Sequence, residues 1–427
     1  MSSPSPLLRA IALAALTVVA ALAAIASPAS ATSSKVTEYK LPAEFALPND
    51  LVTGPDGAVW VTDSSLGRIW RISIKGKIRS YELGQQPAGI TTAHGSMWVA
   101  DASGDAIHRV ETDGSSKTYP LRAGAFPIDI VQGSDGALWF TEGRGDAIGR
   151  ITTDGDITEY PLPTTNAFAG EVAHGSDGAV YFAEQSAGKV GRITTTGVVT
   201  EYALPGADAL PGPIVAGADG ALYVSDRNNN TINRMTTAGI FTDAFAVPRE
   251  NADPVAMTAG PDGALYISEH MSGVISRMTL DGTFTKKYKL RGEFPSPDAL
   301  IVGPDGALWI NQGNWGKVTR LDVGLDQPVR AEATTFTTKA GRSETHTVAT
   351  FTDANPNARA RDYDVSINWG DGSQSDGRVR RNAGGSFKVR GRHTYAKTGT
   401  RRVTVIISDG VGKGVDARVL SSAIVSR

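Results

Sequence analysis

The chain has 427 residues, enough for two or three domains with substantial hydrophobic cores. It contains no cysteine, which excludes disulfides, thiolate metal sites and a cysteine nucleophile, and its 48 glycines, often beside Asp, favour an all-β fold. The formal net charge is −2, yet residues from Arg330 onward carry 17 Lys and Arg against 9 Asp and Glu, which leaves about −10 for the residues before them.

The first predicted element is a signal peptide, residues 1–31. Arg9 precedes an apolar run over residues 10–26, and Ala29 and Ala31 supply the small side chains that a signal peptidase needs. The alternative is an uncleaved membrane anchor, because the run approaches the length that spans a bilayer. We predict cleavage after Ala31, which gives a secreted protein with no stable membrane span.

Residues 32–325 contain a repeat, exemplified by GSDGALWFTEGRGDAIGRITTDGDITEYPLP at 133–163. Its strand-length segments are rich in β-branched and aromatic residues and are separated by Gly and Asp turns. An aromatic anchor in the second strand recurs every 38 to 43 residues, and an arginine follows each anchor by eleven residues. Seven such units of four strands predict a seven-bladed β-propeller. The anchors are Trp60, Trp98, Trp139, Tyr181, Tyr223, Tyr266 and Trp309, and the arginines are Arg71, Arg109, Arg150, Arg192, Arg234, Arg277 and Arg320.

The seventh unit lacks a fourth strand. A segment of that type, VTEYKLP at 36–42, stands instead before the first unit. An incomplete last blade would leave an open sheet edge. We therefore predict that the N-terminal strand pairs into the seventh blade and closes the ring.

A carboxylate stands three residues after six of the seven anchors, at the end of the predicted second strand. If these side chains face one funnel, they predict a site for a cationic ligand or a divalent cation, Mg²⁺ or Ca²⁺. The alternative is a structural cross-strand pair in each blade, such as Glu142 with Arg150. The six are Asp63, Asp101, Glu142, Glu184, Asp226 and Glu269, and Gln312 takes the seventh position.

After a short linker at 326–330, residues 331–427 alternate apolar and polar residues over several strand-length segments, which predicts a β-sandwich. Its excess of positive charge suggests anionic cell-envelope polymers as partners, against the alternative of a solvated face. The aromatic platform of a nucleic-acid-binding module is missing, so we expect no nucleic acid partner. The arginines on or near one predicted hairpin are Arg378, Arg380, Arg381, Arg390 and Arg392.

The repeats GPDGALYISE, GSDGALWFTE and IGRITTDGDITEYPLP resemble those of the virginiamycin B lyase (streptogramin lyase) family, over residues 36–325. The resemblance implies a lyase that opens a cyclic depsipeptide by elimination at its ester, with a histidine base and Mg²⁺. The histidine is expected in a PHGI-like segment that enters the first strand of a blade. The residues aligned with it are Asn49, Ala88, Ile128, Gly170, Gly212, Val255 and Asp298, none of which is an imidazole.

One other histidine stands where chemistry is expected. His270 directly follows Glu269 at the end of a second strand, with Asp226 in the neighbouring blade. Glu269 and His270 are therefore the predicted catalytic acid–base pair. The alternative is an exposed loop histidine without a role.

The segments FTDANPN, INWGDGS and RHTYAKTGT resemble the PKD domain, an immunoglobulin-like β-sandwich, over residues 331–426. The resemblance implies an accessory module. The whole sequence thus predicts a secreted recognition protein whose propeller binds a small-molecule, peptide or glycan ligand. The alternative is a Mg-dependent carbon–oxygen lyase that opens cyclic depsipeptides.

Overall fold

The structure, a computed structural model, describes residues 35–292, 295–323, 329–353, 359–382, 385–408 and 417–427. The predicted signal peptide, residues 1–31, and most of the predicted linker lie outside these ranges. Apart from the 3₁₀ turns η1 (Gln185–Ala187), η2 (Gly313–Trp315) and η3 (Ala360–Asp362), the regular structure is strand. Within the described ranges, no helix is long and apolar enough to cross a membrane. The predicted all-β fold is confirmed.

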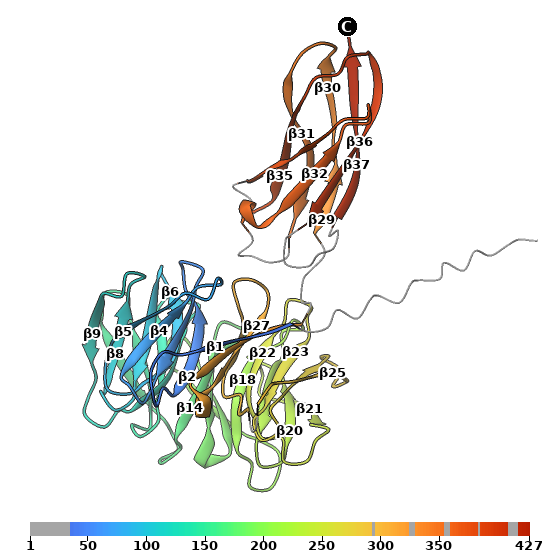
Figure 1. The fold of residues 1–427 in the computed structure, drawn as a ribbon. Helices are drawn as coiled ribbons and strands as arrows, with labels where there is room; N and C mark the ends of the chain where they lie inside the picture. The colour runs from blue at the N-terminus through green and yellow to red at the C-terminus, as the bar shows by residue number, and fades with distance from the viewer. Residues whose placement is uncertain (1–34, 293–294, 324–328, 354–358, 383–384, 409–416) are drawn as a thin grey trace, which may run out of the picture. The chain divides into compact units, whose positions relative to one another are not determined.

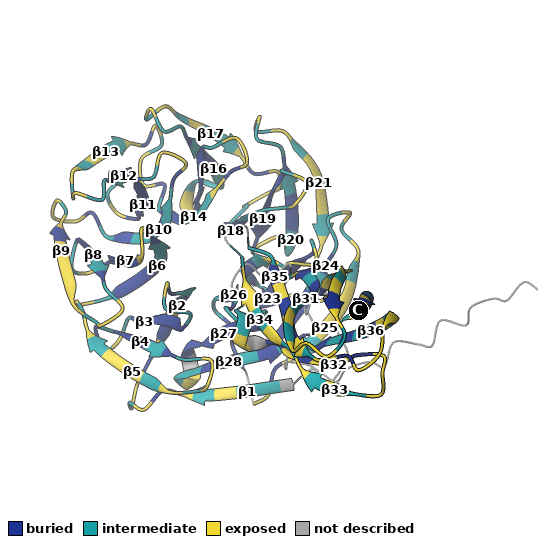
Figure 2. Ribbon diagram, turned by 90° about the horizontal axis from the view of Figure 1, so that it is seen from above, coloured by how far each residue is buried: buried dark blue, intermediate teal, exposed yellow. Residues whose placement is uncertain are grey.

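Residues 35–322 form seven four-stranded antiparallel sheets arranged around a common axis (Figures 1 and 2). This is a β-propeller, and each sheet is a blade. In the first six blades the chain runs outward from the axis, one strand after another. The strands are β2 (Pro48–Thr53), β3 (Val59–Asp63), β4 (Arg68–Ile72) and β5 (Ile78–Glu82); β6 (Pro87–Ala93), β7 (Ser96–Asp101), β8 (Ala106–Val110) and β9 (Ser116–Pro120); β10 (Pro127–Gln132), β11 (Leu138–Glu142), β12 (Ala147–Ile151) and β13 (Ile157–Pro161); β14 (Ala169–His174), β15 (Val180–Glu184), β16 (Lys189–Ile193) and β17 (Val199–Ala203); β18 (Pro211–Ala216), β19 (Leu222–Asp226), β20 (Thr231–Met235) and β21 (Phe241–Ala246); β22 (Pro254–Ala259), β23 (Leu265–Glu269), β24 (Val274–Met278) and β25 (Phe284–Lys289).

The last blade joins the two ends of the propeller segment. Its order is β26 (Leu300–Val302), β27 (Leu308–Gln312), β28 (Lys317–Asp322) and then β1 (Lys35–Lys40), which pairs antiparallel with β28. Tyr39 of β1 stacks on Trp309 with ring centroids 5.2 Å apart, as Tyr81 stacks on Trp60 in the first blade at 5.6 Å. The predicted closure by the N-terminal strand is confirmed.

The repeated arginine is held by an aspartate in the turn before the second strand. In the third blade, Asp135 accepts hydrogen bonds from the indole of Trp139 at 3.1 Å and from Nε of Arg150 at 2.8 Å. The Arg150 guanidinium also lies over the Trp139 ring, 5.7 Å from its centroid. The cross-strand pair predicted as an alternative, Glu142 with Arg150, is therefore not formed. The same aspartate–arginine pair recurs as Asp56–Arg71, Asp177–Arg192, Asp219–Arg234, Asp262–Arg277 and Asp305–Arg320.

The C-terminal residues form two further sheets. One has the order β29 (Arg330–Ala333), β31 (Glu344–Thr352), β35 (Phe387–His393) and β34 (Arg378–Arg381). The other has the order β30 (Thr335–Lys339), β37 (Ala417–Ser426), β36 (Gly399–Ser408), β32 (Asp364–Asn368) and β33 (Gln374–Asp376). Both sheets contribute to one core, in which Trp369 is fully buried and its carbonyl accepts a hydrogen bond from the Tyr395 hydroxyl at 3.1 Å.

Deleting residues 35–42 should unfold the propeller. The deletion removes β1 and also Leu41, which belongs to the buried cluster that joins the last blade to the first. We expect the free energy of unfolding to fall by at least about 5 kcal/mol, because a Tyr, a Leu and a whole strand lose their partners. Calorimetry of the proteins with and without these residues measures this change. An unchanged melting temperature of the propeller transition would show that β1 does not close the ring.

Replacing Asp135 by Asn should lower stability by about 1–2 kcal/mol at pH 7, because the Arg150 guanidinium loses its charged partner. Burial opposes ionisation of Asp135, but hydrogen bonds from Trp139 and Arg150 lower its pKa below the ordinary value. A lowered pKa gives stability that is present above the unfolded-state pKa and lost as the pH falls through the folded-state pKa. The deficit in the free energy of unfolding, measured with urea, should therefore be smaller at pH 3 than at pH 7. The control is Asp154→Asn at an exposed turn position, which should change the free energy of unfolding by less than about 0.5 kcal/mol.

Candidate functional site

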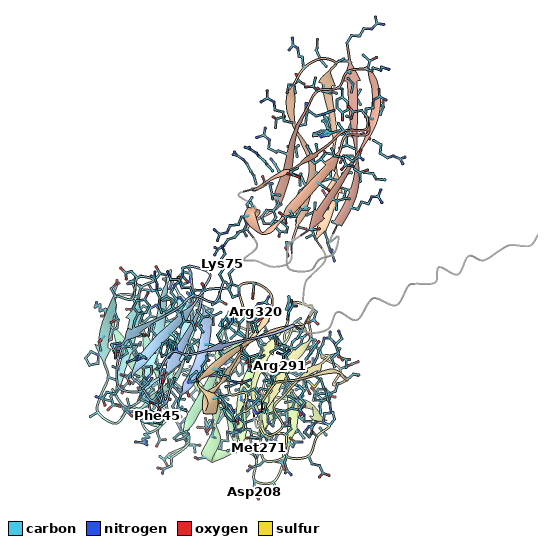
Figure 3. All side chains as sticks on the ribbon, viewed as in Figure 1. Phe45, Lys75, Asp208, Met271, Arg291 and Arg320 are labelled. Atoms are coloured by element: carbon cyan, nitrogen blue, oxygen red, sulfur yellow. The ribbon has the colours of Figure 1, made fainter. Side chains whose placement is uncertain are left out.

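One face of the propeller carries both the loops that lead into the inner strands and the loops that join second to third strands. We call it the mouth face. In Figure 3, Phe45, Asp208 and Met271, which belong to such loops, lie along one side of the ring, and Lys75, in a loop of the opposite face, lies on the other side. Every site residue predicted from the sequence lies at this face, at the end of a second strand or directly after it.

The six predicted carboxylates do not share a funnel, which corrects the sequence-based expectation. Each is at most 2% exposed and is buried beneath the loops of its own blade. Asp63 accepts hydrogen bonds from the backbone N–H of Leu47 at 3.1 Å and from the Trp70 indole at 2.9 Å. Asp101 accepts from the N–H groups of Gln85 and Gln86, and Asp226 from that of Leu210. These side chains hold the loops in place, because loop N–H groups that are buried need an acceptor.

The three glutamates of this set have fewer loop partners. Glu142 forms an ion pair with Arg122 at 2.6 Å, and Glu269 accepts from the Ser272 and Ser276 hydroxyls. Glu184 has no hydrogen-bond partner for either carboxylate oxygen among the described residues. Burial, reinforced by the charge of Glu201, raises the pKa of Glu184 to about 7. Glu184 is therefore a buried carboxylate within its blade, not a ligand-facing one.

The predicted Glu269–His270 pair is not formed either. Glu269 is directed into its own blade, toward Ser272 and Ser276. Nδ1 of His270 instead lies 2.8 Å from a carboxylate oxygen of Asp298, in the next blade. The contact with Asp298 raises the pKa of His270 above its ordinary value, although burial opposes the change. Asp298 is fixed in turn by the backbone N–H of Gly313 at 2.9 Å.

Three carboxylates of the inner strands, missed by the sequence analysis, lie around the axis. Asp50 accepts the N–H of Ile90 in the next blade at 3.0 Å, and Asp129 likewise accepts the N–H of Val172 at 2.9 Å. Glu171 occupies the corresponding position of the fourth blade. Burial raises the pKa of all three carboxyl groups, and the negative charge of Asp129 raises those of Asp50 and Glu171 further. Each of these carboxyl groups is therefore protonated more readily than a solvent-exposed one.

Arg227 links these carboxylates to His270. Its guanidinium binds both carboxylate oxygens of Asp253, at 2.7 and 3.1 Å, and its charge stabilises the ionised form of Glu171. Seven half-buried side chains from six blades thus form one electrostatically connected group, which we call the axial cluster. Its members are Asp50, Asp129, Glu171, Arg227, Asp253, His270 and Asp298.

Exposed apolar side chains share the mouth face with the axial cluster. Phe45 is 80% exposed, and Leu47, Met271 and Trp315 are also exposed. Phe45, Leu47 and Trp315 line an open groove of about 850 Å³ where the last blade meets the first. A ligand at this face would therefore meet apolar surface beside charged and hydrogen-bonding groups, the combination typical of small-molecule sites.

Neither the Mg²⁺ implied by the resemblance nor the Ca²⁺ considered for the carboxylates fits the residues present. Such an ion needs several oxygen ligands that converge at one point. Across the part of the chain that the structure describes, no group of three or more carboxylates and histidines converges in this way. The oxygens of Asp50 and Asp129 already accept backbone N–H groups. The described residues therefore do not form a site for either ion.

The fold and the axial cluster define a β-propeller with a polar site at one end of its axis. The chain matches the profile of the virginiamycin B lyase family over residues 23–211 and 85–358. It belongs to that family. Among curated protein sequences, none matches the chain.

Similar solved structures support this family assignment. Virginiamycin B lyase from Staphylococcus aureus is 31% identical with a TM-score of 0.64, and the match covers 68% of this chain and 99% of that one. A catalytically inactive histidine-to-alanine variant of the S. aureus enzyme with quinupristin matches at 32% identity, TM-score 0.64, over 68% of this chain and 99% of that one. An extracellular domain of a two-component system from B. thetaiotaomicron, 10% identical with a TM-score of 0.57 over 92% of this chain and 59% of that one, shares the fold.

Replacing Glu184 by Gln should stabilise the propeller at high pH. The raised pKa of Glu184, about 7 against 4.5 for the free side chain, means that its favourable protonated form is lost as the pH rises through 7. Glu184→Gln should therefore raise the free energy of unfolding by about 1–3 kcal/mol at pH 8 and leave it unchanged at pH 4, as measured by urea unfolding.

The matched control is Glu201→Gln in the same blade. Glu201 forms an ion pair with Lys189 at 2.7 Å, and its pKa is lowered by Lys189 and Thr164 although burial opposes this. This variant should lose stability at pH 8. Equal responses of the two variants would contradict the assignment of Glu184 as an unpartnered carboxylate.

Proposed function

We propose that the protein is a secreted recognition protein that binds a small peptide-like ligand at the mouth face of a seven-bladed propeller. Residues 331–427 act as an accessory immunoglobulin-like module of the PKD type. Export rests on the Arg9-led apolar run and the small residues Ala29 and Ala31. The family relationship supports the placement of the ligand on the propeller.

The composition of the axial cluster is the observation that carries this proposal. Five carboxyl groups face two cations, Arg227 and His270, and all seven side chains keep part of their surface exposed. Partly buried carboxyl groups with raised pKa values are stabilised most by a ligand that brings a positive charge or several N–H donors. Apolar groups of the same ligand can lie against Phe45, Leu47 or Trp315. A cyclic peptide with aromatic and amine substituents matches both requirements.

A second candidate function is the elimination reaction of the family, and the contact between His270 and Asp298 favours it. A carboxylate oxygen of Asp298 lies 2.8 Å from Nδ1, so a proton on Nδ1 would face that carboxylate and Nε2 would be left to accept a proton. In the reaction, neutral His270 removes a carbon-bound proton of the depsipeptide. The freed electron pair forms a carbon–carbon double bond, and the ester C–O bond breaks to release a carboxylate. Because contact with Asp298 raises the pKa of His270, the rate should rise with pH through that pKa.

The test uses quinupristin, the ligand bound by the inactive S. aureus variant. Calorimetric titration should show binding by the full-length protein, and Glu171→Gln combined with Asp253→Asn should weaken it about tenfold, because the axial cluster loses two carboxyl groups that can accept N–H donors or ionise beside a cation. The control is Asp154→Asn at an exposed turn between β12 and β13, on the face opposite the mouth face, which should bind as the wild type does.

Mass spectrometry of the same mixtures separates the two functions. Intact quinupristin after prolonged incubation, together with binding, supports recognition. A ring-opened product that His270→Ala fails to form supports the lyase. Binding that is identical in wild type and the Glu171–Asp253 double variant would overturn the placement of the ligand.

A further inference from the structure

A regular array of cations lies on the outer face of two neighbouring strands in the C-terminal domain. Strands β34 and β35 place Arg378 directly opposite Arg390 and Arg380 directly opposite Lys388, and Arg392 continues the row along β35. All five side chains are exposed, and they alternate with Val379, Phe387 and Val389, which contribute to the core. Figure 3 shows long side chains with nitrogen ends projecting from this domain.

The array differs from the arginines expected from the sequence. Arg381 lies opposite the buried Phe387, and its guanidinium sits 5.8 Å from the Phe387 ring centroid, so it does not belong to the outer row. Lys388 takes its place in the array. Strand alternation, not proximity in sequence, decides which cations share a face.

Like charges directly opposite one another destabilise a sheet. Two such pairs stand side by side here, and in the described part of the chain none of the five cations lies within ion-pair distance of a carboxylate. Glu344 of β31 pairs with His393, one position along β35 from Arg392, and Glu332 is separated from Lys388 by the whole of strand β31, through Thr350. The free domain therefore carries a concentrated positive charge that an external anion would relieve.

From this geometry we propose that the array binds a linear polymer of polyol units joined by phosphodiesters. Alternate residues of a strand repeat at about 7 Å, and opposite residues of neighbouring strands lie about 5 Å apart. A chain with one phosphate per three-carbon unit has a similar repeat and can follow β35. Each opposed pair of cations can meet one tetrahedral phosphate from two sides, and the arginine fork suits its oxygens.

The face also lacks the features that other anionic partners require. The exposed large apolar residues found in the described part of this domain are Leu420 and Ile424, both on β37 of the other sheet. Single-stranded nucleic acids bind through stacking on aromatic side chains in addition to charge. A partner recognised by charge alone is therefore favoured. This inference concerns the C-terminal domain and does not depend on the proposed ligand of the propeller.

The experiment titrates poly(glycerol phosphate) into the full-length protein at graded NaCl concentrations. The logarithm of the binding constant should fall linearly with the logarithm of the NaCl concentration, because each bound phosphate releases counterions. Arg378→Glu with Arg390→Glu should weaken binding by about tenfold or more. The matched control, Arg402→Glu with Arg418→Glu, makes the same charge change at exposed positions of the other sheet and should change affinity less than about twofold.

Three outcomes would overturn the proposal. One is equal weakening by the two double variants, which would assign binding to net charge. Another is equal or tighter binding of polygalacturonate or oligo-deoxythymidine, which would assign the face to a different polymer. The third is no measurable binding at low salt by a wild-type protein whose melting temperature is normal.

Discussion

The pairing of β1 with β28 is the contact on which the rest of the propeller depends. It joins segments separated by nearly the whole ring, from Lys35–Lys40 to Lys317–Asp322. Non-local pairing of this kind is costly in chain entropy, and it is offset by the buried cluster of Leu41, Trp309 and Val61 that forms where the blades meet. The axial cluster draws its residues from six blades, so its geometry exists only when the ring is closed.

Neighbouring blades are held in register at the axis by side chains that also belong to the candidate site. Asp50 and Asp129 each accept a backbone N–H from the following blade, and the hydroxyls of Thr62 and Thr141 donate to its carbonyls. At the closing junction, Asn311 donates to the carbonyl of Pro48. Two carboxylates of the proposed ligand site thus also form the bonds that fix the spacing of the blades.

The repeat made most of the fold predictable from the sequence. The anchors such as Trp139 and the arginines such as Arg150 recur in register because each blade needs the same packing, and the orphan segment at 36–42 indicated closure. The role of the carboxylates could not be predicted in this way. Asp63 and Asp101 accept buried N–H groups of the loops. These bonds depend on the conformation of the loop backbone, which the spacing of residues in the sequence does not reveal.

The axial carboxylates were missed for the opposite reason. Asp50, Asp129 and Glu171 share the third position of the segments PND, PID and AGE, but the position is Gly89 in the second blade and Pro213 in the fifth, so it does not appear as a repeat. The sequence does place Asp298 at the position aligned with the family's histidine. Its contact with His270 depends on the packing of two blades, which only the closed ring defines.

The central claim is that the axial cluster binds its ligand without a resident divalent cation. Crystals grown with Mn²⁺ and quinupristin, measured at the manganese absorption edge, test it most directly. We predict ligand density beside Glu171, Arg227 and His270 and no anomalous peak among the carboxylates of the cluster. A manganese peak coordinated by three or more of those carboxylates would contradict the account.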